Sequence, residues 1–130
     1  MSARNRLPVL GVLAVLPLIA GCAAAAGAAA GAAGAVAYSE RGATATVDAP
    51  LNDVVAAAEA TLNEMGIAIV ERDTETDDVE LTGNRGDLEV NVDIERSGSV
   101  TEIEVTAKEG TLDYDRDQAR DIVARIVQRL

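Results

Sequence analysis

Hydrophobic and polar residues follow two different periodicities along this chain, and each periodicity predicts a kind of element. Apolar and polar residues alternate from Ala43 to Val47, which indicates a strand with one buried face. From Leu51 to Met65 apolar residues recur at steps of three and four, which predicts a helix of about four turns with one apolar stripe. Pro50 suits the start of this helix, and Gly66 stands where a left-handed cap is expected at its end.

Four further strands are predicted after this helix. The second strand of the chain runs from Ile67 to Asp73, and Val79 and Leu81 open the third. The sequence Gly83-Asn84-Arg85-Gly86 is a strong turn signal and interrupts the third strand. In the last two strands, Leu88–Glu95 and Ile103–Ala107, aliphatic residues alternate with polar and mostly acidic ones. This alternation is typical of an antiparallel sheet with one buried and one solvated face.

The turn between the last two strands fixes their register. A two-residue loop at Gly98-Ser99 pairs Ile94 with Ile103 on the buried face, and a slip by one residue would bury carboxylates. On the solvated face the same register places acidic residues opposite one another. We call these four residues the acidic ladder: Asp93 opposite Glu104, and Glu95 opposite Glu102.

The acidic ladder allows two interpretations. Ca²⁺ and Mg²⁺ prefer several carboxylate oxygens, so Asp93, Glu95, Glu102 and Glu104 are candidate ligands of a weak cation site. The ladder is otherwise a solvated face whose charges keep other strands from pairing with the sheet. No spaced Asp-rich loop accompanies it, so the sequence favours the solvated face and predicts no metal or other cofactor.

The chain returns to helical spacing from Asp115 to Leu130. Acidic residues gather at the start of this segment, while Arg125 and Arg129 lie near its end, an arrangement that favours the helix dipole. The predicted order is therefore βαββββα. We expect an α+β domain over residues 43–130, with a mostly antiparallel sheet and both helices packed on one of its faces. The place of the first strand in this sheet is left open by the pattern.

Residues 1–22 have the pattern of a bacterial lipoprotein signal. Arg4 and Arg6 precede an apolar segment from Leu7 to Ala20, whose fourteen residues are too few for the ~20 that a membrane span requires. Gly21 and the only cysteine of the chain, Cys22, follow directly. A lone free thiol is unusual in an exported protein. We therefore expect cleavage between Gly21 and Cys22 and lipidation of Cys22.

Residues 23–37 are almost entirely alanine and glycine. In a helix, Gly27, Gly31 and Gly34 would share one face that could pack against another helix in a membrane. The segment could instead be a tether, helical or flexible, that holds the folded domain away from the bilayer. Fifteen helical residues span only ~22 Å and alanine is weakly apolar, so we favour a tether over residues 22–42.

The charge and composition narrow the function classes. Without residues 1–21 the chain keeps 9 basic and 22 acidic residues, a formal charge of −13. This balance argues against nucleic acid as a partner and against electrostatic binding to anionic lipid, so the acyl group must supply the membrane attachment. An acidic excess keeps a surface protein soluble or reflects a salty habitat. The chain has no histidine, so His-assisted triads and zinc sites with His ligands are excluded, and we expect no enzymatic activity.

Four features occur in one order: Cys22, the Ala/Gly run through Ala35, the sequence from Ala45 to Leu51 (Ala-Thr-Val-Asp-Ala-Pro-Leu), and the final helix Ile122–Leu130. Together they resemble the small bacterial lipoproteins grouped as domain of unknown function 3568. Members of that family often have an aromatic residue near the position of Val55, where this chain has none. The resemblance implies a cell-envelope lipoprotein with a small α+β domain and no assigned reaction.

We therefore expect a protein on the extracytoplasmic side of a cell membrane, anchored through lipid on Cys22. The resemblance also implies the outer membrane in a Gram-negative host, because Ala23 and not an aspartate follows the cysteine. The domain is expected to be a structural or protein-interaction module with an envelope protein as partner. The alternative is a module that binds a small molecule or a divalent cation. An enclosed pocket between helices and sheet would favour a ligand, and an exposed apolar patch would favour a partner.

Overall fold

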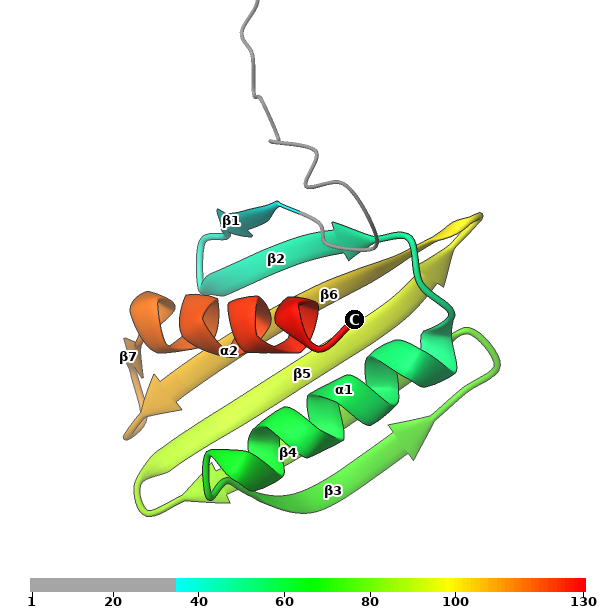
Figure 1. Cartoon of the computed structure of the whole chain (residues 1–130). Helices are drawn as coiled ribbons and strands as arrows, with labels where there is room; N and C mark the ends of the chain where they lie inside the picture. Colours follow the sequence, from blue (N-terminus) through cyan, green and yellow to red (C-terminus); the bar gives the residue numbers. More distant parts are fainter. Residues whose placement is uncertain (1–34) are drawn as a thin grey trace, which may run out of the picture.

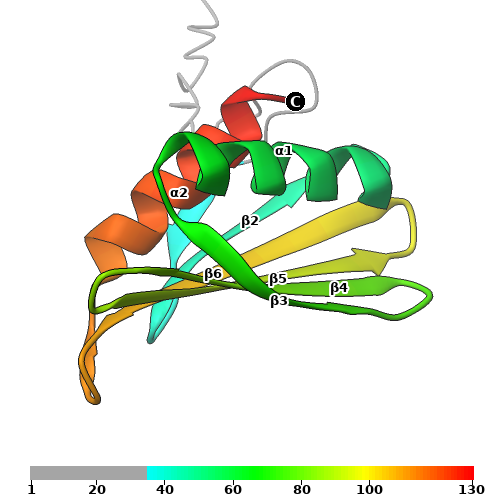
Figure 2. The same cartoon turned by 90° about the horizontal axis from the view of Figure 1, so that it is seen from below.

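The computed structural model describes residues 35–130, in which two helices cover one face of a seven-stranded antiparallel sheet (Figures 1 and 2). The strand order is β1-β2-β6-β5-β4-β3, and β7 pairs with part of β6. No helix within residues 35–130 is long and apolar enough to cross a membrane. The strands are β1 (Val36–Tyr38), β2 (Gly42–Val47), β3 (Ala68–Thr74), β4 (Asp78–Arg85), β5 (Leu88–Ser97), β6 (Val100–Glu109) and β7 (Asp113–Tyr114); the helices are α1 (Leu51–Glu64) and α2 (Arg116–Gln128).

The predicted order of elements and the α+β class are confirmed, with two short strands added. β1 lies within the segment predicted as a tether and pairs with β2, so the sheet begins seven residues earlier than residue 43. β7 precedes α2 and pairs with the end of β6. The predicted signal peptide, the lipidated Cys22 and the rest of the tether up to residue 34 lie outside the described residues.

The predicted register of the last hairpin is confirmed. Ile94 lies opposite Ile103, and the chain turns at Gly98, whose φ of +64° suits glycine. The two-residue turn therefore puts the buried aliphatic residues of β5 and β6 on the helix side and the acidic ladder on the other. The pairs of the acidic ladder form as predicted: Asp93 with Glu104, and Glu95 with Glu102.

The turn predicted at Gly83-Asn84-Arg85-Gly86 is wrong for its first three residues. β4 continues through Arg85, and the chain turns at Gly86, whose φ is +60°. Gly83 lies in the strand because a neighbour approaches it closely. A Cβ at this position would come within 2.6 Å of Cγ2 of Ile67. A glycine inside a strand thus marks a tight contact here and not a turn.

The core between the two layers consists of aliphatic side chains. α2 lies over β2 and β6, while α1 lies over β5, β4 and β3, so the helices divide the sheet between them. Asp115 begins α2 by accepting a hydrogen bond from the backbone N–H of Gln118 at 2.9 Å. The largest fully buried side chains are Leu62, Ile67, Leu81, Ile94, Ile103, Ile122 and Ile126.

Candidate functional site

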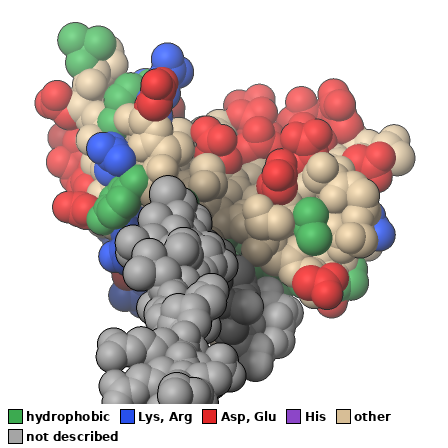
Figure 3. Space-filling view, turned by 90° about the horizontal axis from the view of Figure 1, so that it is seen from above, with side chains coloured by type: hydrophobic (Ala, Val, Ile, Leu, Met, Phe, Trp, Pro, Cys, Tyr) green, Lys and Arg blue, Asp and Glu red, His purple; other side chains and the backbone are tan. Residues whose placement is uncertain are grey.

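The acidic ladder lies on the face of the sheet that carries no helix. Its four side chains are exposed, and together with Thr44 and Thr46 of β2 they line an open hollow of about 230 Å³. Figure 3 shows acidic side chains gathered along the side of the molecule away from the helices. The structure therefore brings Asp93, Glu95, Glu102 and Glu104 together as the sequence predicted.

The carboxyl group of Asp93 has a raised pKa. Its pKa rises from 3.8 to about 6, first because its carboxyl group is partly desolvated, next because its protonated form can share a hydrogen bond with the side chain of Asp78, and last because the carboxylates of Asp78, Glu80 and Glu95 repel its charge. Oδ1 of Asp78 is itself buried and has no hydrogen-bond partner among the described residues. A proton on Asp93 relieves this repulsion, so Asp93 holds its proton more readily than an isolated aspartate does.

The geometry of the ladder does not suit a chelated ion. In residues 35–130 no group of three or more acidic, histidine or cysteine side chains is placed to hold a metal ion. Side chains on one face of a sheet stand roughly parallel, so the four carboxylates point outward and do not converge on one point. The ladder can attract cations and basic side chains but offers no cage to a metal.

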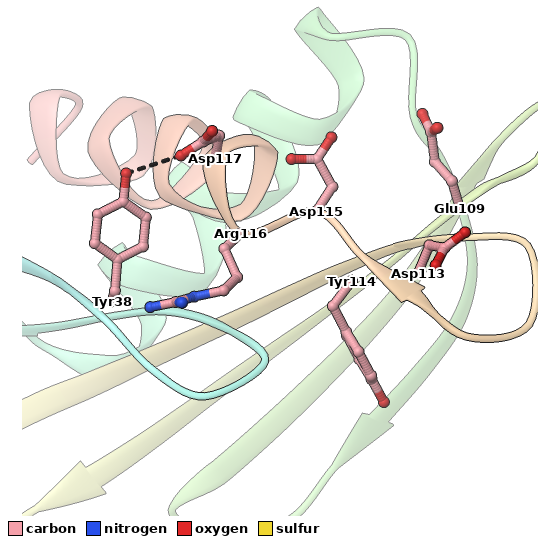
Figure 4. A pocket seen from close by; sticks show the side chains of 7 residues that line it. All are labelled: Tyr38, Glu109, Asp113, Tyr114, Asp115, Arg116 and Asp117. Carbon is pink, nitrogen blue, oxygen red and sulfur yellow. Dashed lines mark hydrogen bonds between the residues drawn. The ribbon is translucent and has the colours of Figure 1, made fainter.

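A second site lies where β1, β7 and the start of α2 meet (Figure 4). The hydroxyl of Tyr38 donates a hydrogen bond to Oδ1 of Asp117 at 2.9 Å. The guanidinium carbons of Arg116 and Arg120 lie 5.0 and 5.4 Å from the centre of the Tyr38 ring. We call Tyr38, Arg116, Arg120, Arg41 and Tyr114 the tyrosine–arginine cluster, because Arg41 lies 5.7 Å from the Tyr114 ring in the same way.

Contacts within the tyrosine–arginine cluster hold β1 against α2. The cluster's hollow of about 540 Å³ is lined by four carboxylates beside the two tyrosines, but guanidinium groups of the chain itself already lie over both rings. The sequence pattern did not predict this cluster. The only signal was that Tyr38 and Tyr114 are the sole aromatic residues, and their separation in sequence hides their proximity.

A third site is a groove between α1 and the edge strand β3. Its volume is about 450 Å³, and small side chains on one face of the helix leave it open. All seven residues of β3 are exposed, including Ile69 at 38% and Val70 at 60%. The register of β3 with β4 shifts between Ile69 and Glu71, so Val70 has no partner in β4. We call this site the α1–β3 groove, lined by Ala56, Glu59, Ala60, Asn63, Ile67, Ala68 and Ile69.

The family model described as "Protein of unknown function (DUF3568)" matches residues 7–129. The matched region includes Cys22 as well as the whole of the described sheet and both helices. No curated protein matches the chain.

Proposed function

Because the chain belongs to the DUF3568 family of proteins of unknown function, we propose that it is a cell-envelope lipoprotein whose α+β domain is a protein-interaction module. The proposal of a lipoprotein rests on Cys22. This cysteine follows a basic start, an apolar segment and small residues in the order that a lipoprotein signal requires. Two or three acyl chains on this cysteine would hold the protein firmly, since each buried CH₂ contributes about 0.8 kcal/mol.

The interaction role is supported by two features of the structure. Side chains fill the space between the helices and the sheet, and the edge strand β3 is exposed to solvent. Leu62 of α1, Ile122 of α2 and Val92 of β5 are all fully buried, so aliphatic side chains occupy the layer between helices and sheet. The hollows described above open to solvent at the edges and outer face. A module that enclosed a small ligand would need space between the layers. Exposed Ile69 and Val70 on an edge strand suit a macromolecular partner better.

A catalytic role has little support from this geometry. The carboxylates of the acidic ladder stand on an open face, where water screens them and nothing orients a substrate. We therefore propose a domain without enzymatic activity.

One observation favours cation binding as the second candidate function. The acidic ladder gathers four carboxylates on one face, and Asp78 and Glu80 lie close to its Asp93, a concentration of negative charge that a divalent cation would relieve. If the ladder binds Ca²⁺, millimolar Ca²⁺ raises the melting temperature of the full chain, and Asp93→Asn removes the increase. An unchanged melting temperature eliminates this candidate.

The interaction role can be tested by cross-linking in intact cells, followed by capture of the full chain from membranes. The expected result is one recurrent envelope protein, captured with wild type and lost with Cys22→Ser, because the unlipidated precursor does not reach its partner. Capture of the same protein by both forms would contradict the anchoring, and capture of none would contradict the interaction role.

A further inference from the structure

We propose that the α1–β3 groove binds an extended segment of a partner protein, which adds to the sheet as a strand beside β3. This inference names the docking surface of the proposed interaction module and rests on that role. The partner segment alternates apolar residues with lysine or arginine.

The edge strand β3 supplies the backbone partners for such a strand. Among the described residues, β3 pairs with β4 on one side and with no strand on the other. An edge of seven residues presents free N–H and C=O groups that can bind an added strand. The opposite edge offers less, because β1 has only three residues and Tyr38 holds it against α2.

Charged side chains that would keep another strand from pairing with β3 cover only part of this strand. Charged side chains protect its second half, where Arg72 forms an ion pair with Glu59 of α1. The first half, Ala68–Val70, has no charge, and its Ala68 and Ile69 line the groove. On α1, Ala56 and Ala60 lie one turn apart on the face that lines the groove, and their small side chains leave space beside Glu59 and Asn63. An apolar side chain on the helix side of an added strand can enter this space.

Acidic residues near β3 determine which side chains are favoured on the helix-free face of the added strand. Residues 71–78 contain five acidic residues and one basic residue, and the helix-free face of the sheet carries the acidic ladder. Alternate residues of an added strand point to this face. Lysine or arginine at those positions is therefore favoured, which gives the partner its alternating pattern. A second copy of this acidic chain lacks that complementarity.

The α1–β3 groove also lies far from the end of the domain that joins the rest of the chain, which leaves it accessible to a partner. The described chain begins at residue 35 beside β1, and β1 and β3 are the two edges of the sheet. Five strand spacings separate them, a distance of about 24 Å. β3 therefore lies at the opposite edge of the sheet from residue 35, where the described chain begins (Figure 1).

The test uses the full chain in detergent and a capped octapeptide of alternating valine and lysine. Two isomers of this peptide carry N-methyl groups on either all valines or all lysines. Successive residues of a strand direct their N–H groups to opposite edges, so methylation blocks one edge in each isomer. We expect the parent peptide to slow hydrogen exchange in residues 68–74, and one isomer but not the other to lose binding.

Two variants locate the contact. Ala60→Gln fills the groove from an exposed helix position, and we expect it to raise the Kd of the parent peptide about tenfold or more. Asn52→Gln, on an exposed position of the same helix outside the groove, is the matched control and should leave the Kd unchanged.

The proposal is overturned if both methylated isomers bind like the parent, if protection falls on the acidic ladder and not on β3, or if no binding occurs. Dimerisation of the chain without peptide, dispersed by Val70→Lys, would also overturn it in favour of a second copy. The proposed function would survive each of these results if cross-linking in cells still captured an envelope partner that Ala60→Gln does not affect.

Discussion

At the scale of single residues, Asp93 shows how a regular alternation of residues creates local electrostatic repulsion. Its strand alternates as the sequence predicts, and that same alternation places Asp93 among Glu80, Glu95 and Glu104. The sequence therefore predicted the acidic pairs from the hairpin register. It could not predict the shift of the Asp93 pKa, because that shift also depends on β4, whose Asp78 comes near only through the pairing of β4 with β5.

Asp93→Asn should raise stability at neutral pH and not in acid. The pKa of Asp93 is raised from 3.8 to about 6, so the folded state binds the proton more tightly than the unfolded state. Its contribution to stability is fully present below about pH 4 and is lost as the pH rises through about 6. We expect a higher melting temperature for the variant at pH 7.5 and an equal one near pH 3.5.

Glu89→Gln is the control for this prediction, because Glu89 lies on the same face of β5 but opposite Lys108, 3.9 Å away. It should give no such gain at pH 7.5. An equal effect of Asp93→Asn at both pH values would show that its charge is not the cause.

Gly42→Ala should destabilise the domain through a backbone clash. The added Cβ would lie 1.9 Å from the carbonyl oxygen of Val105 in the neighbouring strand β6, and neither backbone can move without disturbing the β2–β6 ladder. We expect the free energy of unfolding to fall by about 2 kcal/mol or more in urea titrations. Thr46→Ala, at an exposed position on β2, should change it by less than about 0.5 kcal/mol, and similar losses for both variants would refute the clash.

At the scale of elements, the sequence predicted the long strands with a regular alternation but not the short strands. The strands β5 and β6 have ten residues each, with an alternation that admits one register. β1 has three residues in an Ala/Gly-rich context and β7 has two, so neither carries a detectable period. Both exist because β2 and β6 offer free edges, which is a property of the assembled sheet.

Tyr38→Ala should release β1 while leaving the rest of the sheet folded. The variant loses the hydrogen bond to Asp117 and the contacts with Arg116 and Arg120, which together contribute about 2 kcal/mol. We expect amide hydrogen exchange of residues 36–38 to accelerate by about tenfold or more, with little change in β5.

Tyr114→Ala is the matched control, since Tyr114 is not a residue of β1 and makes its ring contact with Arg41. It should affect β1 less than Tyr38→Ala does. Unchanged protection of β1 in Tyr38→Ala would mean that backbone pairing alone holds this strand.

At the scale of the whole molecule, the two edges of the sheet differ. β1 joins the domain to the segment that follows Cys22, and β3 presents an open edge on the far side. The lipid anchor at Cys22 stays a prediction from the sequence, which rests on a local pattern, a cysteine directly after an apolar segment. The α1–β3 groove was not predicted, because its width depends on how far Ala56 and Ala60 stand from a strand that follows the helix.

The most direct test of the central claim is the chemical state of Cys22. Cells that express the full chain are fed radiolabelled palmitate, and the membrane-bound protein is analysed by mass spectrometry. We predict a labelled polypeptide that begins at an acylated Cys22, and an unlabelled precursor for Cys22→Ser. Label in the Cys22→Ser variant, or a wild-type chain with residues 1–21 attached and a free thiol, would contradict the account.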